Sequence, residues 1–133
     1  MKKSHVGDFG TPIAMVIANA YERKESFLMN DELPSVELLS ELYTEAKYKA
    51  TNSKEFKKKS DKILFAFQKE NNQVLKSVWD KICNSSRSEF NSIFRLLDVN
   101  VEEYGESFYS PFIPSLIEEL KKKKLLMRGF FIF

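Results

Sequence analysis

The chain has 133 residues, of which 43% are hydrophobic and 30% charged, a composition that suits a single soluble domain with a modest core. Its four glycines and four prolines supply few of the turns that a β-sandwich or β-barrel requires, so the composition favours helices. The net charge of +2, from 21 basic and 19 acidic residues, is too even to indicate a nucleic-acid-binding protein, and a single cysteine excludes an internal disulfide.

No stretch of the sequence predicts a membrane anchor or a secretion signal. Apolar runs stay well short of the roughly 18 residues that a bilayer-spanning helix needs. The basic start, Met1–Lys3, leads into polar Ser4 and His5, where a signal peptide would have an apolar stretch. We therefore expect a cytoplasmic protein with no membrane partner.

A glycine-containing loop at residues 7–10 precedes the first predicted helix. Thr11 and Pro12 predict its start, because threonine caps helix N-termini and proline is tolerated in the first turn. Residues 24–33 break the helical period and predict a loop. The buried face of this helix is expected to consist of Ile13, Val16, Ile17, Ala20 and Tyr21.

Two further helices are predicted between residues 34 and 70. The first begins near Pro34, and the second follows residues 51–53, where Asn52 and Glu55 have capping-box spacing. The second also carries five lysines, which indicate a solvated face, although contact with phosphates is the alternative. The apolar positions are Leu39, Leu42, Tyr43, Ala46 and Ala50 in the first helix and Phe56, Ile63, Leu64 and Phe67 in the second; the lysines are Lys54, Lys57, Lys58, Lys59 and Lys62.

The longest predicted helix surrounds Trp79 and ends near Asp98. Its apolar residues keep helical spacing over roughly six turns. We therefore expect Trp79 in the core, and we interpret Cys83 as a core thiol, the alternative being a nucleophile paired with His5. The apolar face consists of Leu75, Val78, Trp79, Ile82, Ser86, Phe90, Ile93, Phe94 and Leu97.

The last third of the chain predicts a loop at residues 99–110 and a final helix that starts at 110–111 or 115 and ends at Lys124. This helix is expected to bury Phe112, Leu116, Ile117 and Leu120. Val6 and residues 125–127 and 130–133 are strand-like, but no second strand is evident, and an isolated strand leaves its backbone groups unpaired. We therefore expect a mainly α, helical bundle-like chain that was cut from a larger protein.

Residue chemistry alone predicts no complete catalytic or metal-binding set. The sequence has one histidine, one cysteine, no Walker loop and no recognisable triad. Three hypotheses remain open at this point: part of an enzyme, a free-standing helical module that binds RNA or an acidic protein through its lysines, and a structural helical domain without a ligand.

Several stretches, taken in order, resemble arginyl-tRNA synthetases. Residues 4–11, Ser-His-Val-Gly-Asp-Phe-Gly-Thr, resemble the family's Asn-His-(Val or Leu)-Gly-Asp-Trp-Gly segment. Residues 86–91 are similar to the family's long helix, and residues 105–109 are similar to the segment that follows it. Residues 55–58 and 79–82 also fall in family-like order, so the resemblance covers roughly residues 4–124.

The sequence departs from the family pattern at several positions. Phe9 replaces the family's tryptophan, Pro12 its glutamine and Ala14 a later glycine. If that glutamine lines the active site, its role is lost here. The tail at residues 125–133 does not follow the family pattern.

The resemblance implies a helical connective region in the catalytic domain of a class I synthetase. Residues 1–11 would end the first nucleotide-binding half, residues 12–124 would form the connective region, and residues 125–133 would be an unmatched apolar tail. The parent enzyme, in the cytoplasm or an organelle, would use ATP with Mg²⁺ to activate arginine and transfer it to tRNA-Arg. The family's HIGH-like and KMSK-like motifs are not found in this sequence, so we expect the isolated chain to be inactive and to bind no cofactor.

Asp8 and His5 are the expected site residues, because ligands of α/β folds bind at the carboxyl ends of parallel strands. We predict that Asp8 lines a pocket; the alternative is that it braces the glycine turn by accepting hydrogen bonds from backbone amides. No catalytic residue and no metal ligand is predicted. Apolar helix faces without partners also predict self-association of the chain.

Overall fold

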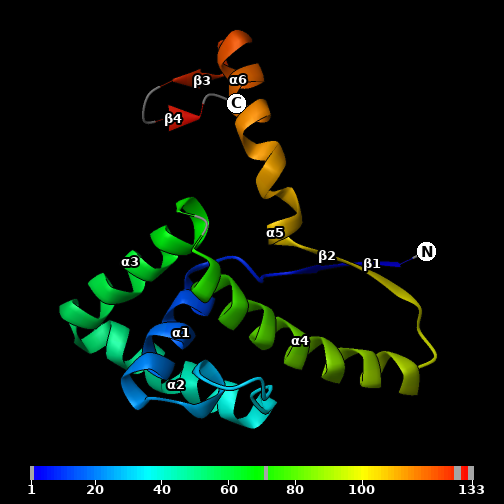
Figure 1. The fold of residues 1–133 in the computed structure, drawn as a ribbon. Coiled ribbons are helices and arrows are strands. Elements are labelled where there is room, and N and C mark those ends of the chain that lie inside the picture. Colours follow the sequence, from blue (N-terminus) through cyan, green and yellow to red (C-terminus); the bar gives the residue numbers. More distant parts are fainter. Residues whose placement is uncertain (1, 71, 128–129, 132–133) are drawn as a thin grey trace.

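The computed structural model describes residues 2–70, 72–127 and 130–131 and is mainly α-helical, as the sequence predicts. Helices α1 to α4 pack together into a body, and α5, η2 and α6 rise from it as an arm (Figure 1). No helix in the described part of the chain is long and apolar enough to cross a bilayer. The elements in chain order are β1 Lys2–Val6, α1 Thr11–Arg23, η1 Ser26–Leu28, α2 Val36–Asn52, α3 Lys54–Lys69, α4 Gln73–Leu96, β2 Val101–Gly105, α5 Glu106–Tyr109, η2 Ser110–Phe112, α6 Ile113–Lys122, β3 Leu126–Met127 and β4 Phe130–Phe131.

Side-chain caps set the start of three helices. Ser35 accepts a hydrogen bond from the Leu38 amide at the start of α2, and Ser53 does the same for α3. Asn72 accepts two backbone hydrogen bonds at the start of α4. The predicted caps were one residue out in two places, since Gly10 rather than Thr11 precedes α1 and Ser53 rather than Asn52 precedes α3.

The core lies where α1 meets α2, α3 and α4. Ile17 and Leu42 are completely buried, and Phe27 from η1 closes the same cluster. Ala18 contacts a second cluster that joins α1 to the α2–α3 hairpin. Burial of these side chains is the main stabilising contribution to the body, because apolar area removed from water contributes about 25 cal/mol per Å². The two clusters contain Val16, Ile17, Ala20, Phe27, Leu39, Leu42, Leu75, Val78 and Ile82, and Ala18, Ala46 and Phe56.

The loop predicted at residues 24–33 contains one short helical turn, η1, and α4 holds it in place. The Lys81 ammonium donates to the Phe27 carbonyl oxygen at 3.0 Å. The Ser85 hydroxyl donates to the Pro34 carbonyl oxygen at 2.5 Å and is itself buried. Polar residues of α4 thereby satisfy backbone acceptors that the loop cannot pair within itself.

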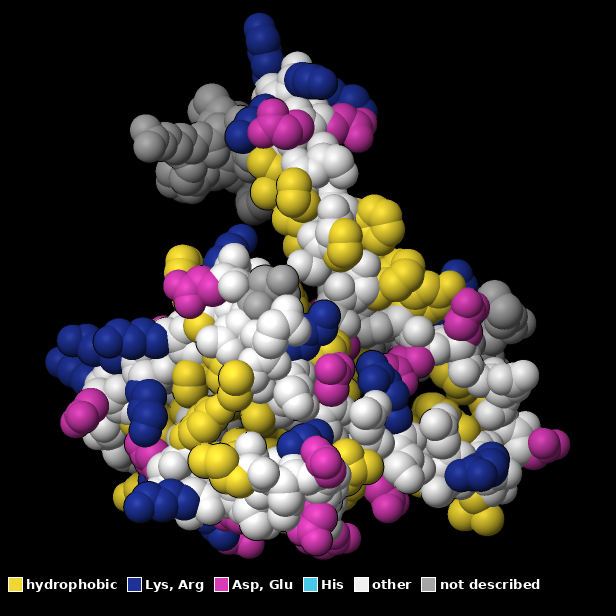
Figure 2. All heavy atoms as spheres, viewed as in Figure 1, with side chains coloured by type: hydrophobic (Ala, Val, Ile, Leu, Met, Phe, Trp, Pro, Cys, Tyr) yellow, Lys and Arg dark blue, Asp and Glu magenta, His cyan; other side chains and the backbone are white. Residues whose placement is uncertain are grey.

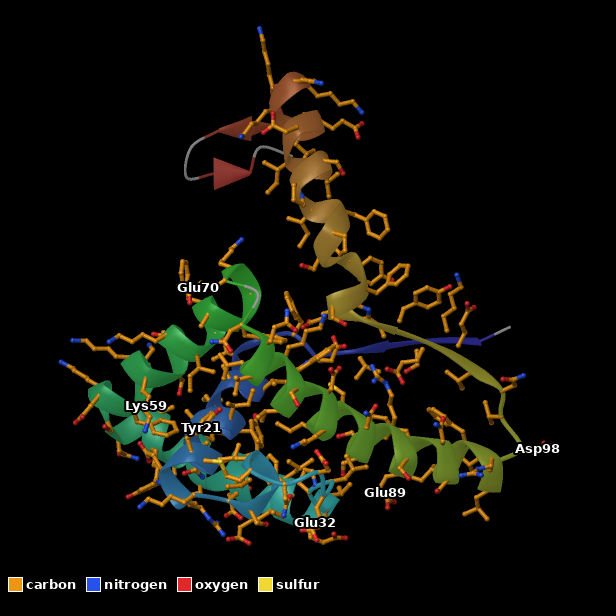
Figure 3. The ribbon with its side chains drawn as sticks, in the orientation of Figure 1. Tyr21, Glu32, Lys59, Glu70, Glu89 and Asp98 are labelled. Atoms are coloured by element: carbon orange, nitrogen blue, oxygen red, sulfur yellow. The ribbon has the colours of Figure 1, made fainter. Side chains whose placement is uncertain are left out.

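The prediction of a loop over residues 99–110 was wrong. Residues 101–105 form β2, which pairs in parallel with β1 in the register Val6 to Gly105, and α5 follows directly. The expectation that the terminal strand-like segments have no partner was also wrong, because β3 pairs antiparallel with β4. Residues 128–129 and 132–133 of that predicted strand region lie outside the described residues. Asp98, labelled in Figure 3, adopts a φ of 51° where the chain turns from α4 toward β2.

Several residues predicted to be buried are not. Trp79 is only partly buried, and α4 turns its second half out of the core, where Ile93 is 50% and Leu97 63% exposed. Along the arm, Phe112 is 57% and Leu116 53% exposed, and hydrophobic side chains follow its surface in Figure 2. The periodicity identified the apolar face of each helix correctly, but the described chain supplies no element to cover it.

Candidate functional site

The carboxyl ends of β1 and β2 meet at one edge of the parallel pair. The 7–10 turn leaves β1 there and leads into α1, while β2 runs directly into α5 (Figure 1). Ligands of parallel α/β folds bind at this edge, outside the strand ends. The residues that approach it come from five elements far apart in the sequence, so it is the candidate functional site.

Asp8 is the buried centre of this edge, with 5% of its surface exposed. Its Oδ1 accepts from the Ser107 amide at 2.9 Å, and its Oδ2 accepts from the Ser107 hydroxyl at 2.6 Å. The carboxylate thus caps the first turn of α5, where backbone amides are otherwise unpaired. Asp8 therefore connects two segments 99 residues apart, which is a different brace from the local one considered for the glycine turn.

Gly105 is a glycine because of Asp8. A Cβ atom at residue 105 would lie 2.3 Å from Asp8 Oδ2 and 2.6 Å from its Cγ, far inside van der Waals contact. The backbone conformation at this residue, with φ −74°, is open to any amino acid. The requirement is therefore close approach of the carboxylate to the main chain, which gives the turn its exact spacing.

Helices α3 and α4 hold the same turn from the other side. The Trp79 indole N–H donates to the Asp8 carbonyl oxygen at 2.5 Å, and the Gln68 amide donates to the Phe9 carbonyl oxygen at 2.7 Å. The rings of Phe9 and Phe67 lie 4.9 Å apart, and those of Phe67 and Trp79 lie 5.5 Å apart, both tilted. Main-chain acceptors and ring contacts together fix the turn against the helical body.

Two hollows flank this edge. One, of about 170 Å³, is lined by Asp8, Cys83 and Arg87 among others. Arg87 donates from Nε to Glu103 Oε1 at 2.8 Å, and this bond raises the pKa of the guanidinium. The second is a larger cleft of about 660 Å³ between the α3–α4 corner and α5.

His5, the other predicted site residue, lies on the exposed side of β1. Its ring centroid is 5.6 Å from that of Tyr109, and no hydrogen bond joins it to Asp8. Cys83 is buried, and burial raises the pKa of its thiol to about 12, as expected of a core cysteine rather than a nucleophile. The residues that sequence reasoning missed are Gln68, Glu103 and Ser107, which carried no local signal because their partners are remote in sequence.

The lysines of α3 lie on its outer side. Lys59, labelled in Figure 3, pairs with Glu22 at 3.1 Å, and Lys49 pairs with the same carboxylate. On α6, Lys121 pairs with Glu118 at 2.9 Å. These are solvent-exposed pairs of the kind that stabilise a helix surface only slightly.

The residues of this edge and the order of the elements match known proteins. Residues 1–129 match the family described as tRNA synthetases class I (R), catalytic domain. The chain belongs to that family. The resemblance predicted from the sequence is thus confirmed, and the matched range continues past residue 124, where we expected it to end.

Individual relatives of the family agree in sequence and in fold. The chain is 39% identical over 126 residues to the arginine–tRNA ligase of Chlamydia pneumoniae, covering 95% of this chain and 21% of that protein. It is 38% identical over 123 residues to a probable cytoplasmic arginine–tRNA ligase of Drosophila melanogaster, covering 92% and 18%. The crystal structure of the Plasmodium falciparum arginyl-tRNA synthetase superposes with a TM-score of 0.72 at 34% identity, covering 96% of this chain and 20% of that one. The chain therefore spans about a fifth of the length of the arginine–tRNA ligases it matches.

Proposed function

We propose that this chain acts as the helical connecting part of an arginine–tRNA ligase catalytic domain. Residues 1–11 end the first nucleotide-binding half, residues 12–124 form the connection, and residues 125–133 lead out of it. The enzyme as a whole activates arginine with ATP and Mg²⁺ and transfers it to tRNA-Arg, in the cytoplasm or in an organelle. The match of residues 1–129 to the synthetase family carries this proposal.

In this proposal, Asp8 is a positioning residue near the substrate site. Its carboxylate already accepts two hydrogen bonds from Ser107, so its charge is used to keep the β1 turn and α5 together. It also lines the 170 Å³ hollow, next to the Arg87–Glu103 pair. His5, exposed beside Tyr109 one strand turn earlier, contributes from the outer side of the same edge.

The chain alone is expected to have no synthetase activity. Within residues 2–70, 72–127 and 130–131, no three acidic, histidine or cysteine side chains gather as metal ligands, so we assign no step through Mg²⁺ here. Activation of arginine depends on groups that position and stabilise the phosphates. In this proposal other parts of the enzyme supply them, and this chain supplies spacing and support.

A segment exchange tests the proposal. Residues 1–129 replace the aligned segment of the Chlamydia pneumoniae ligase, and arginine-dependent aminoacylation of tRNA is measured. We expect the chimera to retain activity because the fold and the bracing contacts are kept. A second chimera with Asp8→Ala should lose at least about tenfold in rate, since a misplaced turn disturbs substrate alignment.

The control is a chimera with Lys57→Gln, which changes an exposed side chain on α3, away from the turn. It should aminoacylate at the parent rate. A chimera that folds, as judged by circular dichroism, but does not charge tRNA with arginine would refute the proposal. Pyrophosphate exchange by the 133-residue chain alone would refute the division of labour within it.

The exposed apolar arm also supports self-association of the isolated chain. Phe112, Ile113 and Leu116 are about half exposed on consecutive turns of the arm. Contiguous apolar surface of this kind is typical of interfaces. In the whole enzyme the same surface is expected to contact other parts of the polypeptide.

A further inference from the structure

The 660 Å³ cleft has the shape and lining of a ligand site that Asp8 does not enter. It lies between the α3–α4 corner and the arm, and its wall is formed by aromatic and basic side chains from five elements. The lining residues on which the inference depends are Phe9, Phe67, Lys69, Lys76, Trp79 and Phe108.

Three of the rings form a rigid aromatic cluster in the cleft wall. Phe9, Phe67 and Trp79 are each partly buried and contact one another in series, at 4.9 and 5.5 Å between centroids. The hydrogen bond from the Trp79 indole to the Asp8 carbonyl oxygen fixes the end of the series. Phe108, 49% exposed on α5, lines the same cleft. Aromatic surface that is fixed in place and still open to solvent is suited to stacking against a planar ring.

The charge of the cleft is positive. Lys69 and Lys76 are exposed and, among the described residues, neither ammonium has a hydrogen-bond or ion-pair partner. The third cation, Arg87, is neutralised by Glu103. The 24-residue helix α4 begins beside Lys76 with no acidic residue in its first turn, which adds to the positive potential. An anionic group next to the stacked ring would therefore be favoured.

We propose that this cleft binds an unpaired nucleotide of an RNA strand, with its base on the Phe9–Phe67–Trp79 cluster and its phosphates at Lys69 and Lys76. Aromatic stacking combined with a basic rim is how proteins hold single strands without reading their sequence. A duplex keeps its base faces stacked internally and cannot use such a wall, and an aliphatic anion would leave the rings unused. The natural strand, a tRNA, rests on the proposed function; the binding chemistry does not.

Trp79 reports on binding directly, because it is the only tryptophan of the chain. The full 133-residue chain is titrated with a six-nucleotide oligoadenylate while the indole fluorescence is followed. We expect saturable quenching that Phe108→Ala weakens about tenfold, within the range measured for loss of one base–aromatic stack. The double variant Lys69→Gln/Lys76→Gln should make the slope of log affinity against log salt shallower by about 1.4, from about 0.7 for each phosphate contact.

Matched variants outside the cleft serve as controls. Phe65→Ala removes a ring on α3 that is 58% exposed, and Lys57→Gln/Lys58→Gln removes two exposed charges from the same helix. Both should leave quenching and salt dependence unchanged, with all variants checked for helicity by circular dichroism. The substituted side chains are exposed, so folding should be preserved throughout.

Three results would overturn the inference. They are no saturable quenching, equal quenching by a duplex RNA of the same length, and an equal effect of Phe108→Ala and Phe65→Ala. The outcome is separable from that of the segment exchange. An inactive chimera together with specific quenching would overturn the ligase proposal alone, and an active chimera without quenching would overturn this inference alone.

Discussion

Gly105→Ala should be among the most destabilising single-methyl changes available in this chain. The added Cβ would lie 2.3 Å from Asp8 Oδ2 and 2.7 Å from Oδ1, so it overlaps a whole carboxylate and not the end of a flexible side chain. Asp8 is short and buried, and its carboxylate cannot move aside while keeping both hydrogen bonds from Ser107. The substitution must therefore either break those bonds or separate β2 from the β1 turn.

The magnitude follows from these two routes. Hydrogen bonds to a charged group contribute about 1.5–3 kcal/mol each, part of which is recovered when the displaced carboxylate meets water. Overpacking of a fixed site costs about 1–3 kcal/mol. Because the chain takes whichever route is cheaper, we expect Gly105→Ala to lower the free energy of unfolding by about 2–4 kcal/mol.

Urea denaturation followed by circular dichroism measures this loss. Gly7→Ala is the matched control, because no atom lies within 4 Å of a Cβ placed at that glycine, and it should change stability by less than about 0.5 kcal/mol. The decisive comparison is Gly105→Ala in an Asp8→Ala background. With the carboxylate gone, the added methyl should cost no more than about 1 kcal/mol, as expected for alanine in place of glycine at a helix N-cap.

The reasoning fails if Gly105→Ala costs the same in both backgrounds. Additive effects would mean that residue 105 is constrained by its own backbone and not by Asp8. A near-neutral Gly105→Ala in the parent chain would mean that the turn adjusts freely, and the candidate site would then lack the rigidity assigned to it.

Three further outcomes are expected. The Cys83 thiol, whose pKa burial raises to about 12, should react with a disulfide reagent at pH 8 only slowly in the folded chain and rapidly in urea; equal rates would contradict its burial. Hydrogen bonds from Lys49 and then Asn19 lower the pKa of Glu45 from 4.5 to about 2, so its contribution is complete above pH 4.5 and is lost as the pH falls toward 2. Glu45→Gln should therefore cost about 1 kcal/mol at pH 7, a screened value because the side chain is 38% exposed, and less at pH 3, as measured by urea midpoints; an equal cost at both pH values would contradict this sign. Phe112→Ser/Leu116→Ser should shift the chain toward monomer in sedimentation velocity relative to Lys122→Gln, and an unchanged distribution would show that the arm does not drive self-association.

The helical body was predictable because its signals are local. The apolar spacing that placed Ile17, Leu42 and Val78 on buried faces depends only on residues within a few turns. The helix starts were right to within a residue, because serine and asparagine caps act on amides two or three positions away. The family resemblance was also legible from short segments in order, and residues 1–129 bear it out.

The parallel pair was missed for a physical reason. β1 and β2 are separated by about a hundred residues, and a five-residue strand carries too little pattern to identify a distant partner. The same separation hid Ser107, which looks like an ordinary helix-starting serine until Asp8 is placed beside it. Asp8 itself was singled out correctly as the residue of interest at the strand end, but its hydrogen-bond partner could only come from the fold.

The error over the arm is of another kind and says more about the chain. Periodicity measures which side of a helix avoids water, and it predicted burial of Phe112, Leu116 and Ile117 without naming what buries them. In the structure these side chains stay between 37% and 57% exposed. The same is true of Ile93 and Leu97 at the far end of α4, although the face that begins at Leu75 is buried at its start. A face that is buried where α1 reaches it and exposed where α1 ends is continuous in sequence but has only half its partner. Since the chain spans about a fifth of its relatives, we infer that the missing half belongs to the rest of the ligase, and adding those segments should protect the amides of α6 and of residues 90–97 from hydrogen exchange while leaving those of α1 unchanged.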